Sequence, residues 1–261
     1  MGELTVLLPC LNEEQALPPL LMRFRDVQEH LPALWRLSVL VVDDGSTDRT
    51  AQLAREHHPP PGTTLIQHET NRGLGEALRT GIAWFLAQPP ADSERVLAVM
   101  DADGTHPPEL LGAMLGALYG ATDEAGAPLC DVVIASRYAP GGEEHGLPRL
   151  RLAYSRIASF VLRLLARLPG VRDYTCGYRL YRRDALARAR ERFGDALITE
   201  RSFVCMAELL IKLGRSRARI AEVPLSLHYE LKGGPSKMNV PRTILRYVAL
   251  SWRLLFDPRL R

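Results

Sequence analysis

Short apolar runs that alternate with helical stretches constrain the fold of this 261-residue chain more than any other feature of its sequence. Each run is rich in Val, Leu and Ile, as expected of strands that are buried on both faces of a sheet. Because parallel strands need a crossover connection, the alternation predicts an α/β fold with a mostly parallel sheet flanked by helices. The predicted strands are Leu4–Pro9, Leu37–Val42, Leu65–His68, Val96–Met100 and Val132–Ser136.

The pattern changes after Arg137, where a loop-like stretch leads into an amphipathic helix predicted over Leu152–Leu168. A short strand at Cys176–Arg182 and a last helix over Pro241–Phe256 are also predicted. Both helices carry arginines on one side and apolar residues on the other, which is typical either of core packing or of a membrane interface. The apolar arc of the last helix is wide, so we expect it to meet a membrane surface or a membrane-anchoring partner. The division predicted is a main domain, 1–240, and a C-terminal amphipathic helix, 241–261.

Charge and composition narrow the classes of partner and compartment. The net charge of +3 is too small to indicate nucleic acid, and no nucleic-acid partner is expected. No apolar run approaches the roughly 20 residues needed to cross a bilayer, and no basic region typical of a signal peptide is visible. The four cysteines lack metal-binding spacing, which indicates a reducing compartment. We therefore expect a cytoplasmic protein, peripheral at the cytoplasmic face of a membrane.

Polar and acidic residues follow three of the predicted strands directly: Asn12-Glu13, Asp43–Ser46 and Asp101–Asp103. The carboxyl ends of parallel strands meet at one edge of the sheet, where open α/β sheets bind their ligands. Acidic groups at this edge can accept hydrogen bonds from ribose hydroxyls and base N–H groups. The three clusters therefore predict one binding site.

Asp101 and Asp103 point to a metal within that site. Two carboxylates this close repel each other unless a cation lies between them. Mg²⁺ and Mn²⁺ prefer oxygen ligands and often complete their coordination with the phosphates of a substrate. The alternative is that Asp-x-Asp-Gly only forms a turn at the end of a strand.

Several motifs, in order, resemble family-two glycosyltransferases of the GT-A fold, and most of all the dolichol-phosphate mannose synthase branch. They are VLLPCLNEE, VVDDGSTDRT, NRGLGEALRTGI, VMDADGTHPPEL, ASRY and CGYRLYR, and the resemblance runs from Leu4 to Lys237. It implies that residues 1–240 form a catalytic domain. It also implies transfer of a sugar from a nucleotide sugar, with GDP-mannose favoured and UDP-sugars as alternatives, to a polyprenyl phosphate.

The resemblance also implies roles for residues at the sheet edge. Pro9, Glu13, Val42 and Asp44 would line the nucleoside pocket, with Leu11 at a position where the branch usually has an aromatic residue. Asp101 and Ala102 would contact ribose and phosphates, and Asp103 would be the main ligand of Mg²⁺ or Mn²⁺. Thr105 stands where the branch often has Gln and would serve the metal through its hydroxyl or a water, and His106 is a further candidate ligand.

Basic residues of the second half would serve the phosphates. The candidates for the acceptor phosphate are Arg137, Arg151 and Arg179, because arginine suits bidentate phosphate binding. The alternative is that these arginines only pair with acidic loops. Lys237 matches a lysine of the family's flexible basic loop, and Lys232 lies near its upstream arginine, so this loop would close over the donor diphosphate.

The implied reaction is an inverting attack of a phosphate oxygen on the anomeric carbon. Such a phosphate is largely ionised near pH 7, so no enzyme base is required. One alternative keeps the fold but transfers sugar to a saccharide hydroxyl, which needs a base such as Glu200 or Glu208. Another is a nucleotide-sugar-binding subunit of a membrane complex that has no catalytic activity.

Overall fold

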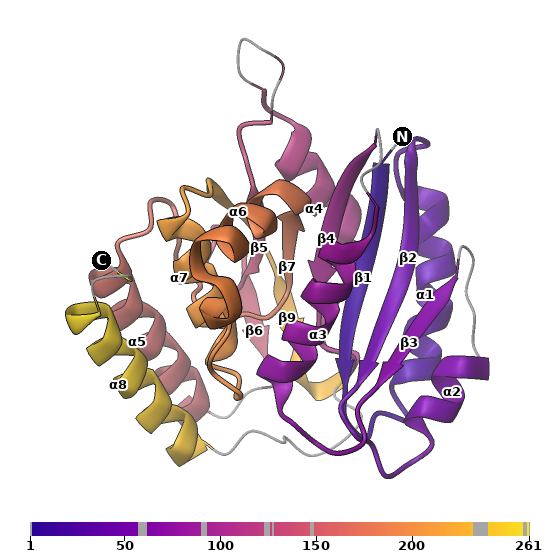
Figure 1. Ribbon diagram of the computed structural model, residues 1–261, viewed down its shortest axis with the longest axis horizontal. Coiled ribbons are helices and arrows are strands. Elements are labelled where there is room, and N and C mark those ends of the chain that lie inside the picture. The colour runs from indigo at the N-terminus through magenta and orange to yellow at the C-terminus, as the bar shows by residue number, and fades with distance from the viewer. Residues whose placement is uncertain are drawn as a thin grey trace.

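The computed structural model describes residues 2–56, 62–89, 93–122, 126, 128–146, 149–231, 240–257 and 260. Its main sheet has seven strands in the order β3-β2-β1-β4-β7-β5-β8 (Figure 1). All neighbouring strands pair in parallel except β7, which is antiparallel to β4 and β5. This confirms the predicted α/β class. The strands are β1 (Gly2–Cys10), β2 (Trp35–Asp43), β3 (Thr63–Gln67), β4 (Glu94–Val99), β5 (Val132–Ser136), β7 (Arg179–Arg182) and β8 (Ile220–Pro224).

Helices cover both faces of this sheet (Figure 1). On one face α1 (Leu17–His30) packs against α2 (Thr50–Glu56) and α4 (Leu110–Tyr119). On the other, α3 (Leu74–Ala87) packs against α6 (Arg183–Phe193) and α7 (Cys205–Arg215). Most residues of the central strands β1 and β4 are buried between the two layers, which explains their nearly continuous apolar sequences.

A small second sheet lies beyond the main one and was not predicted. It pairs β6 (Glu143–His145) with β9 (Ser226–His228), and the imidazole rings of His145 and His228 stack across it with centroids 4.6 Å apart. Both strands are short and lack an apolar run, so their sequences carry no strand signal. Their pairing depends on contacts between segments that are far apart in the chain.

The two long amphipathic helices, α5 (Arg149–Ala166) and α8 (Val240–Phe256), pack side by side at one end of the molecule (Figure 1). Apolar side chains on both helices stay exposed, among them Phe160 and Leu164 on α5 and Leu245 and Trp252 on α8. None of the helices in the described ranges combines the length and the apolar character needed to span a lipid bilayer.

The helix α8 carries three arginines in a stripe, Arg242, Arg246 and Arg253. Arg246 lies 3.0 Å from a carboxylate oxygen of Glu200, and Arg253 lies 2.9 Å from one of Glu208. Two of the three arginines in the stripe therefore face the protein. The apolar arc faces outward, because the arginine side of the helix finds its counter-charges in the segment before α7 and in α7 itself.

The start of α3 shows how closely the elements around the site approach one another. A Cβ atom on Gly75 would lie 1.8 Å from the backbone oxygen of Glu200, and the N–H of Gly75 donates to the backbone oxygen of Arg201 at 3.1 Å. Only glycine permits this contact between α3 and the segment that precedes α7.

We therefore expect Gly75→Ala to destabilise the protein by about 1–3 kcal/mol, the usual cost of overpacking. Gly112→Ala is the matched control, since Gly112 also lies in a helix, α4, and a Cβ there meets nothing within 4 Å. Alanine is the better helix former, so this control should gain about 0.5–1 kcal/mol. Urea unfolding of both variants measures the difference, and an equal effect would contradict the close contact at Gly75.

Candidate active site

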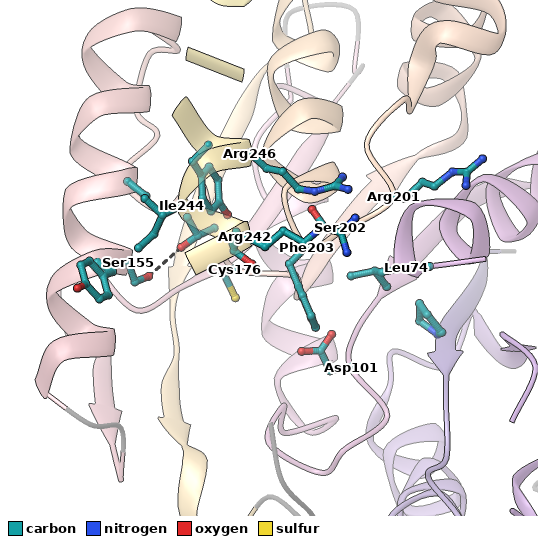
Figure 2. Close-up of a pocket in the computed structure, with 18 of the residues that line it drawn as sticks. Leu74, Asp101, Ser155, Cys176, Arg201, Ser202, Phe203, Arg242, Ile244 and Arg246 are labelled. Atoms are coloured by element: carbon teal, nitrogen blue, oxygen red, sulfur yellow. Dashed lines mark hydrogen bonds between the residues drawn. The ribbon is translucent and has the colours of Figure 1, made fainter. Parts of the chain in front are cut away.

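A single large cavity of about 870 Å³ opens at the carboxyl ends of β1, β2 and β4 and continues between α5 and α8. Asp101 lies on its floor with Phe203 pointing toward it, while Ser155 extends into it from α5 (Figure 2). Residues from both halves of the sequence therefore share this cavity. Of the residues predicted for the site, Pro9, Leu11, Glu13, Asp44, Asp101, Ala102, Asp103, Thr105, His106 and Arg137 line it.

The two carboxylates after β4 differ in their surroundings. The side chain of Asp101 is 39% exposed, toward the cavity, and a Cβ atom on Gly177 would come within 3.4 Å of its Oδ1. Asp103 is nearly buried, and its Oδ1 accepts hydrogen bonds from the hydroxyl of Thr105 at 2.6 Å and from the N–H of Thr105 at 3.1 Å. Thr105 therefore positions the Asp103 carboxylate.

These oxygens are suitable ligands for a hard divalent cation. Among the residues that the structure describes, no cluster of three or more His, Cys, Asp or Glu side chains has metal-binding geometry. A Zn²⁺ site supplied wholly by protein ligands is not built here. Mg²⁺ or Mn²⁺ fits better, since such ions bind one or two carboxylates and take the rest of their ligands from water and substrate phosphates.

His106 supports the turn that begins at Asp101. Its Nδ1 accepts a hydrogen bond of 3.0 Å from the N–H of Asp101, and its ring stacks on Tyr178 with centroids 5.1 Å apart. Its Nε2 is 4.0 Å from the nearer oxygen of Asp101. Because Nδ1 is occupied as an acceptor, the ring acts as a support for the turn rather than as a metal ligand through that atom.

Asp44 holds together the side of the cavity that was predicted to bind the nucleoside. Its two carboxylate oxygens accept hydrogen bonds from the N–H groups of Arg72 and Gly73, at 3.0 and 2.7 Å, and from the imidazole of His68 at 2.7 Å. Asp44 thus fixes the loop before α3 at the cavity wall. Val42 is the exception among the predicted nucleoside residues, because it is fully buried in β2 and does not line the cavity.

Arg137 lines the cavity, but carboxylates already surround its guanidinium. It makes a bidentate pair with Asp173, 2.8 Å for each bond, and a further bond of 3.2 Å to Glu144. Burial alone would raise the pKa of Asp173, but the charge of Arg137 overcomes this and lowers that pKa below its usual value. The alternative raised from the sequence was that these arginines pair with acidic residues, and this describes the side chain of Arg137.

The structure corrects the role expected for Arg179. We expected it to bind phosphate, yet it is fully buried and donates to the backbone oxygens of Met206 and Tyr174 at 2.5 and 2.9 Å. It therefore ties the strand β7 to its neighbours. The side chain of Arg151 and the whole of Lys232 and Lys237 lie outside the described residues.

Glu200 and Glu208, the two glutamates considered as bases, both form ion pairs with basic side chains. Glu208 is buried and accepts hydrogen bonds from Lys212 at 2.7 Å and from the N–H groups of Thr199 and Glu200, both at 2.8 Å. Burial would raise the pKa of Glu208, but Lys212 and these donors lower it. Glu200 pairs with Arg246 and Arg253. Ion-paired carboxylates of this kind are poor general bases.

Two hydroxyl groups in the cavity wall were not predicted from the sequence. The Oγ atoms of Ser155 and Thr175 lie 3.1 Å apart in the cavity wall. Arg137 donates to the Thr175 hydroxyl at 2.6 Å. Neither residue belongs to a distinctive motif. Arg72 and Arg201 also line the cavity, and no carboxylate among the described residues lies within ion-pair distance of them. In the sequence, one feature pointed to Arg72, namely its place in the NRGLG segment.

The wall between α5 and α8 is mainly apolar. This part of the wall is formed by Ile157 and Val161 of α5 and by Ile244, Val248 and Trp252 of α8. The cavity is therefore polar at the sheet edge and apolar in the groove between the helices. A cavity of this kind is suited to a ligand with a charged end and an apolar end.

Comparisons with known proteins agree with this geometry. Residues 5–189 match Glycosyl transferase family 2. The chain is 35% identical to polyprenol monophosphomannose synthase of Mycolicibacterium smegmatis, covering 90% of this chain and 80% of that protein. It is also 35% identical to undecaprenyl-phosphate mannosyltransferase of Micrococcus luteus, covering 92% of this chain and 88% of that protein. Among solved structures, glucosyl-3-phosphoglycerate synthase of Mycobacterium tuberculosis with Mn²⁺, UDP and phosphoglyceric acid superposes with a TM-score of 0.65, at 21% identity over 98% of this chain and 79% of that one.

Proposed function

Because this chain belongs to glycosyltransferase family 2, we propose that it transfers mannose from a nucleotide sugar to a polyprenyl phosphate. Its architecture is the GT-A fold of its structural neighbours. The observation that carries the proposal is the continuous cavity, which joins the carboxylates at the sheet edge to an apolar groove between α5 and α8. GDP-mannose is the donor that the sequence resemblance favours, and UDP-sugars are the alternative.

The donor would lie at the sheet edge. Asp44 holds the loop that contains Arg72 and Gly73 against the nucleoside side of the cavity. Asp101 and Asp103 would hold Mg²⁺ or Mn²⁺, which when bound supplies positive charge to the leaving diphosphate. Arg72 and Arg201 add positive charge along the same wall. Lys232, Lys237 and Arg151 keep the phosphate-binding roles predicted for them.

The acceptor would lie across the groove, with its phosphate near the hydroxyls of Ser155 and Thr175 and its chain between α5 and α8. A phosphate oxygen attacks the anomeric carbon, the bond from that carbon to the diphosphate oxygen breaks, and the diphosphate leaves with the bonding electrons. The configuration inverts. In this arrangement Arg137 is a positioning residue that holds Thr175, and the chain's main contribution is to align two anions.

Transfer to a saccharide hydroxyl is the less favoured alternative. It needs a general base, and both Glu200 and Glu208 are engaged in ion pairs.

Cys176 also lines the cavity, but burial, with a smaller contribution from Asp173, raises the pKa of its thiol to about 12. The thiol therefore stays protonated and does not act as a nucleophile near neutral pH.

A donor screen tests the proposal directly. Purified protein is incubated with a polyprenyl phosphate, Mg²⁺ or Mn²⁺ and one radiolabelled nucleotide sugar at a time, and label is followed into the organic phase. We expect transfer from GDP-mannose that EDTA abolishes and that added metal restores. Transfer only to a water-soluble saccharide would favour the hydroxyl acceptor, and nucleotide binding with no transfer to any acceptor would favour the non-catalytic subunit.

We also propose that the exposed apolar sides of α5 and α8 contact the membrane that holds the acceptor. A contiguous set of large apolar side chains is costly in water, and a lipid surface would cover it. The groove opens between the same two helices, so an acceptor could enter it from the lipid without crossing water.

Leu245→Glu is expected to weaken binding to phosphatidylcholine vesicles by about tenfold, because Leu245 is 70% exposed on α8 and does not line the cavity. Met22→Glu on α1 is the matched control, since Met22 is 68% exposed on a helix far from this surface. Vesicle co-sedimentation provides the measurement. Equal losses in the two variants would contradict a membrane contact through α8.

A further inference from the structure

A second cleft, of about 470 Å³, lies at the carboxyl end of α5. Three arginines border it: Arg163 in the last turn of the helix, Arg167 just after it, and Arg172 beyond the turn formed by residues 168–171. Ser155, which faces the large cavity, and Arg163 are about 12 Å apart along the helix axis. None of the residues that line this cleft lines the large cavity, although Leu162 of that cavity precedes Arg163 directly in the helix.

The three guanidinium groups have no carboxylate within ion-pair distance among the described residues. The Oε1 atom of Glu222 accepts the backbone N–H groups of Arg172 and Asp173, both at 2.7 Å. The positive charges of three arginines along one cleft repel one another. The partial negative charge at a helix end offsets part of this for Arg163 and Arg167, but Arg172 does not belong to the helix.

The backbone at Arg167 adds to the cost of this arrangement. Arg167 has a φ of +51°, in the left-handed region, at the position after a helix where glycine is usual. Its N–H still donates to the backbone oxygen of Arg163 at 3.1 Å, and its Nε donates to that of Leu164 at 3.3 Å. The helix end therefore retains an arginine where a side chain is unfavourable.

We propose that this cleft binds the phosphate of an acidic membrane lipid. Three guanidinium groups in a concave surface are suited to a phosphate, for which arginine is the preferred bidentate donor. The exposed side chains of Phe160 and Leu164 flank the arginines on α5, so the phosphate is met beside an apolar surface. A free phosphate gains nothing from that apolar surface, whereas a lipid whose headgroup binds here places its acyl chains against it.

The inference rests on the membrane contact proposed above but not on sugar transfer. It places an anionic headgroup at the carboxyl end of α5, while the acceptor phosphate would lie near Ser155, toward the amino end of the same helix. The two sites would fix the direction in which α5 lies on the membrane surface.

Co-sedimentation with two kinds of vesicle tests the assignment: phosphatidylcholine alone, and phosphatidylcholine mixed with phosphatidylglycerol. The variant R163Q/R167Q/R172Q should lose on the order of 100-fold in affinity for the mixed vesicles and keep its affinity for phosphatidylcholine. The control R25Q/R36Q/R55Q removes the same charge from exposed arginines of α1, β2 and α2, and should retain the preference for mixed vesicles. Arg172→Gln alone, outside any helix, should lose about fivefold, which keeps the test valid if the triple variant is unstable.

Three results would overturn the assignment. The triple variant could keep the full preference for mixed vesicles, or the control could lose as much as the triple variant. The wild type could show no preference for mixed vesicles while it binds inorganic phosphate through these arginines, which would make the cleft a site for free phosphate. Turnover on a water-soluble prenyl phosphate, measured without vesicles, should be unchanged in the triple variant. If wild-type protein shows the arginine-dependent preference but no transfer, the lipid site stands and the proposed function fails.

Discussion

Replacing Asp103 with Asn is expected to reduce turnover with a polyprenyl phosphate acceptor by about 1,000-fold or more. The loss of several kcal/mol of transition-state stabilisation follows from removing the carboxylate proposed to hold the metal at the leaving diphosphate. Asn keeps the shape of the side chain, and its oxygen can still accept the hydrogen bond from the Thr105 hydroxyl. The variant should therefore fold normally, so its thermal midpoint should be close to that of the wild type.

A second readout separates the loss of the metal from a general disturbance of the site. In wild-type protein, Mn²⁺ should strengthen the binding of the nucleoside diphosphate, and in the Asp103→Asn variant this dependence on Mn²⁺ should disappear. Asp26→Asn on the exposed side of α1 is the control for charge, and it should change neither quantity. Near-normal turnover in the Asp103 variant would reject the metal assignment.

Asp173→Asn is expected to lower the free energy of unfolding by about 3–5 kcal/mol, because it leaves the buried guanidinium of Arg137 without its main counter-charge. The carboxylate of Asp173 is fully buried and also accepts the N–H groups of Thr175 and Cys176, both at 3.0 Å. For a chain of this size the change corresponds to a drop of about 10 °C in the thermal midpoint. Urea unfolding and thermal denaturation measure both quantities.

Glu109→Gln is the matched control, since Glu109 also makes a bidentate pair with an arginine, Arg23, but at the surface. Removing that pair should change the free energy of unfolding by less than about 1 kcal/mol, since solvent screens the interaction. Both carboxylates make a bidentate pair with an arginine, but only Asp173 is buried and accepts backbone N–H groups as well, so the contrast tests the buried setting as a whole. Equal effects in the two variants would contradict the role assigned to the buried pair.

The same pair predicts how stability depends on pH. The pKa of Asp173 is lower in the folded protein than in the unfolded chain, so its ionised form stabilises the fold. This contribution is complete above the unfolded pKa, roughly 4, and is lost as the pH falls through the lower folded value. The Asp173→Asn variant should show a smaller loss of stability than the wild type on acidification from neutral pH to pH values below about 4.

The position of the site could be predicted from the chain alone for a simple physical reason. Parallel strands place their carboxyl ends at one edge, so polar residues that follow successive apolar runs must meet there. Asn12, Asp44, Asp101 and Asp103 lie at that edge as expected. The antiparallel direction of β7 and the pairing of β6 with β9 could not be predicted, because both depend on the path of the chain between distant segments.

Arginines were the least predictable residues. Arg137, Arg179 and Arg246 look alike in the sequence, but Arg137 pairs with buried carboxylates, Arg179 donates to backbone oxygens, and Arg246 holds α8 to Glu200. The charge of an arginine is known from its type, whereas its partner is known only when distant segments have come together. The same holds for Ser155 and Thr175, whose hydroxyls meet in the cavity wall.

The last helix separates the two kinds of information most clearly. Its sequence determined an apolar side and an arginine side, because the helical period places residues three and four apart on one face. Which side meets the protein was decided by the tertiary structure, since Glu200 and Glu208 supply the counter-charges for Arg246 and Arg253 and leave Leu245 and Trp252 exposed. A periodic pattern specifies the faces of a helix, but only the charges and shapes of its neighbours specify which face is buried.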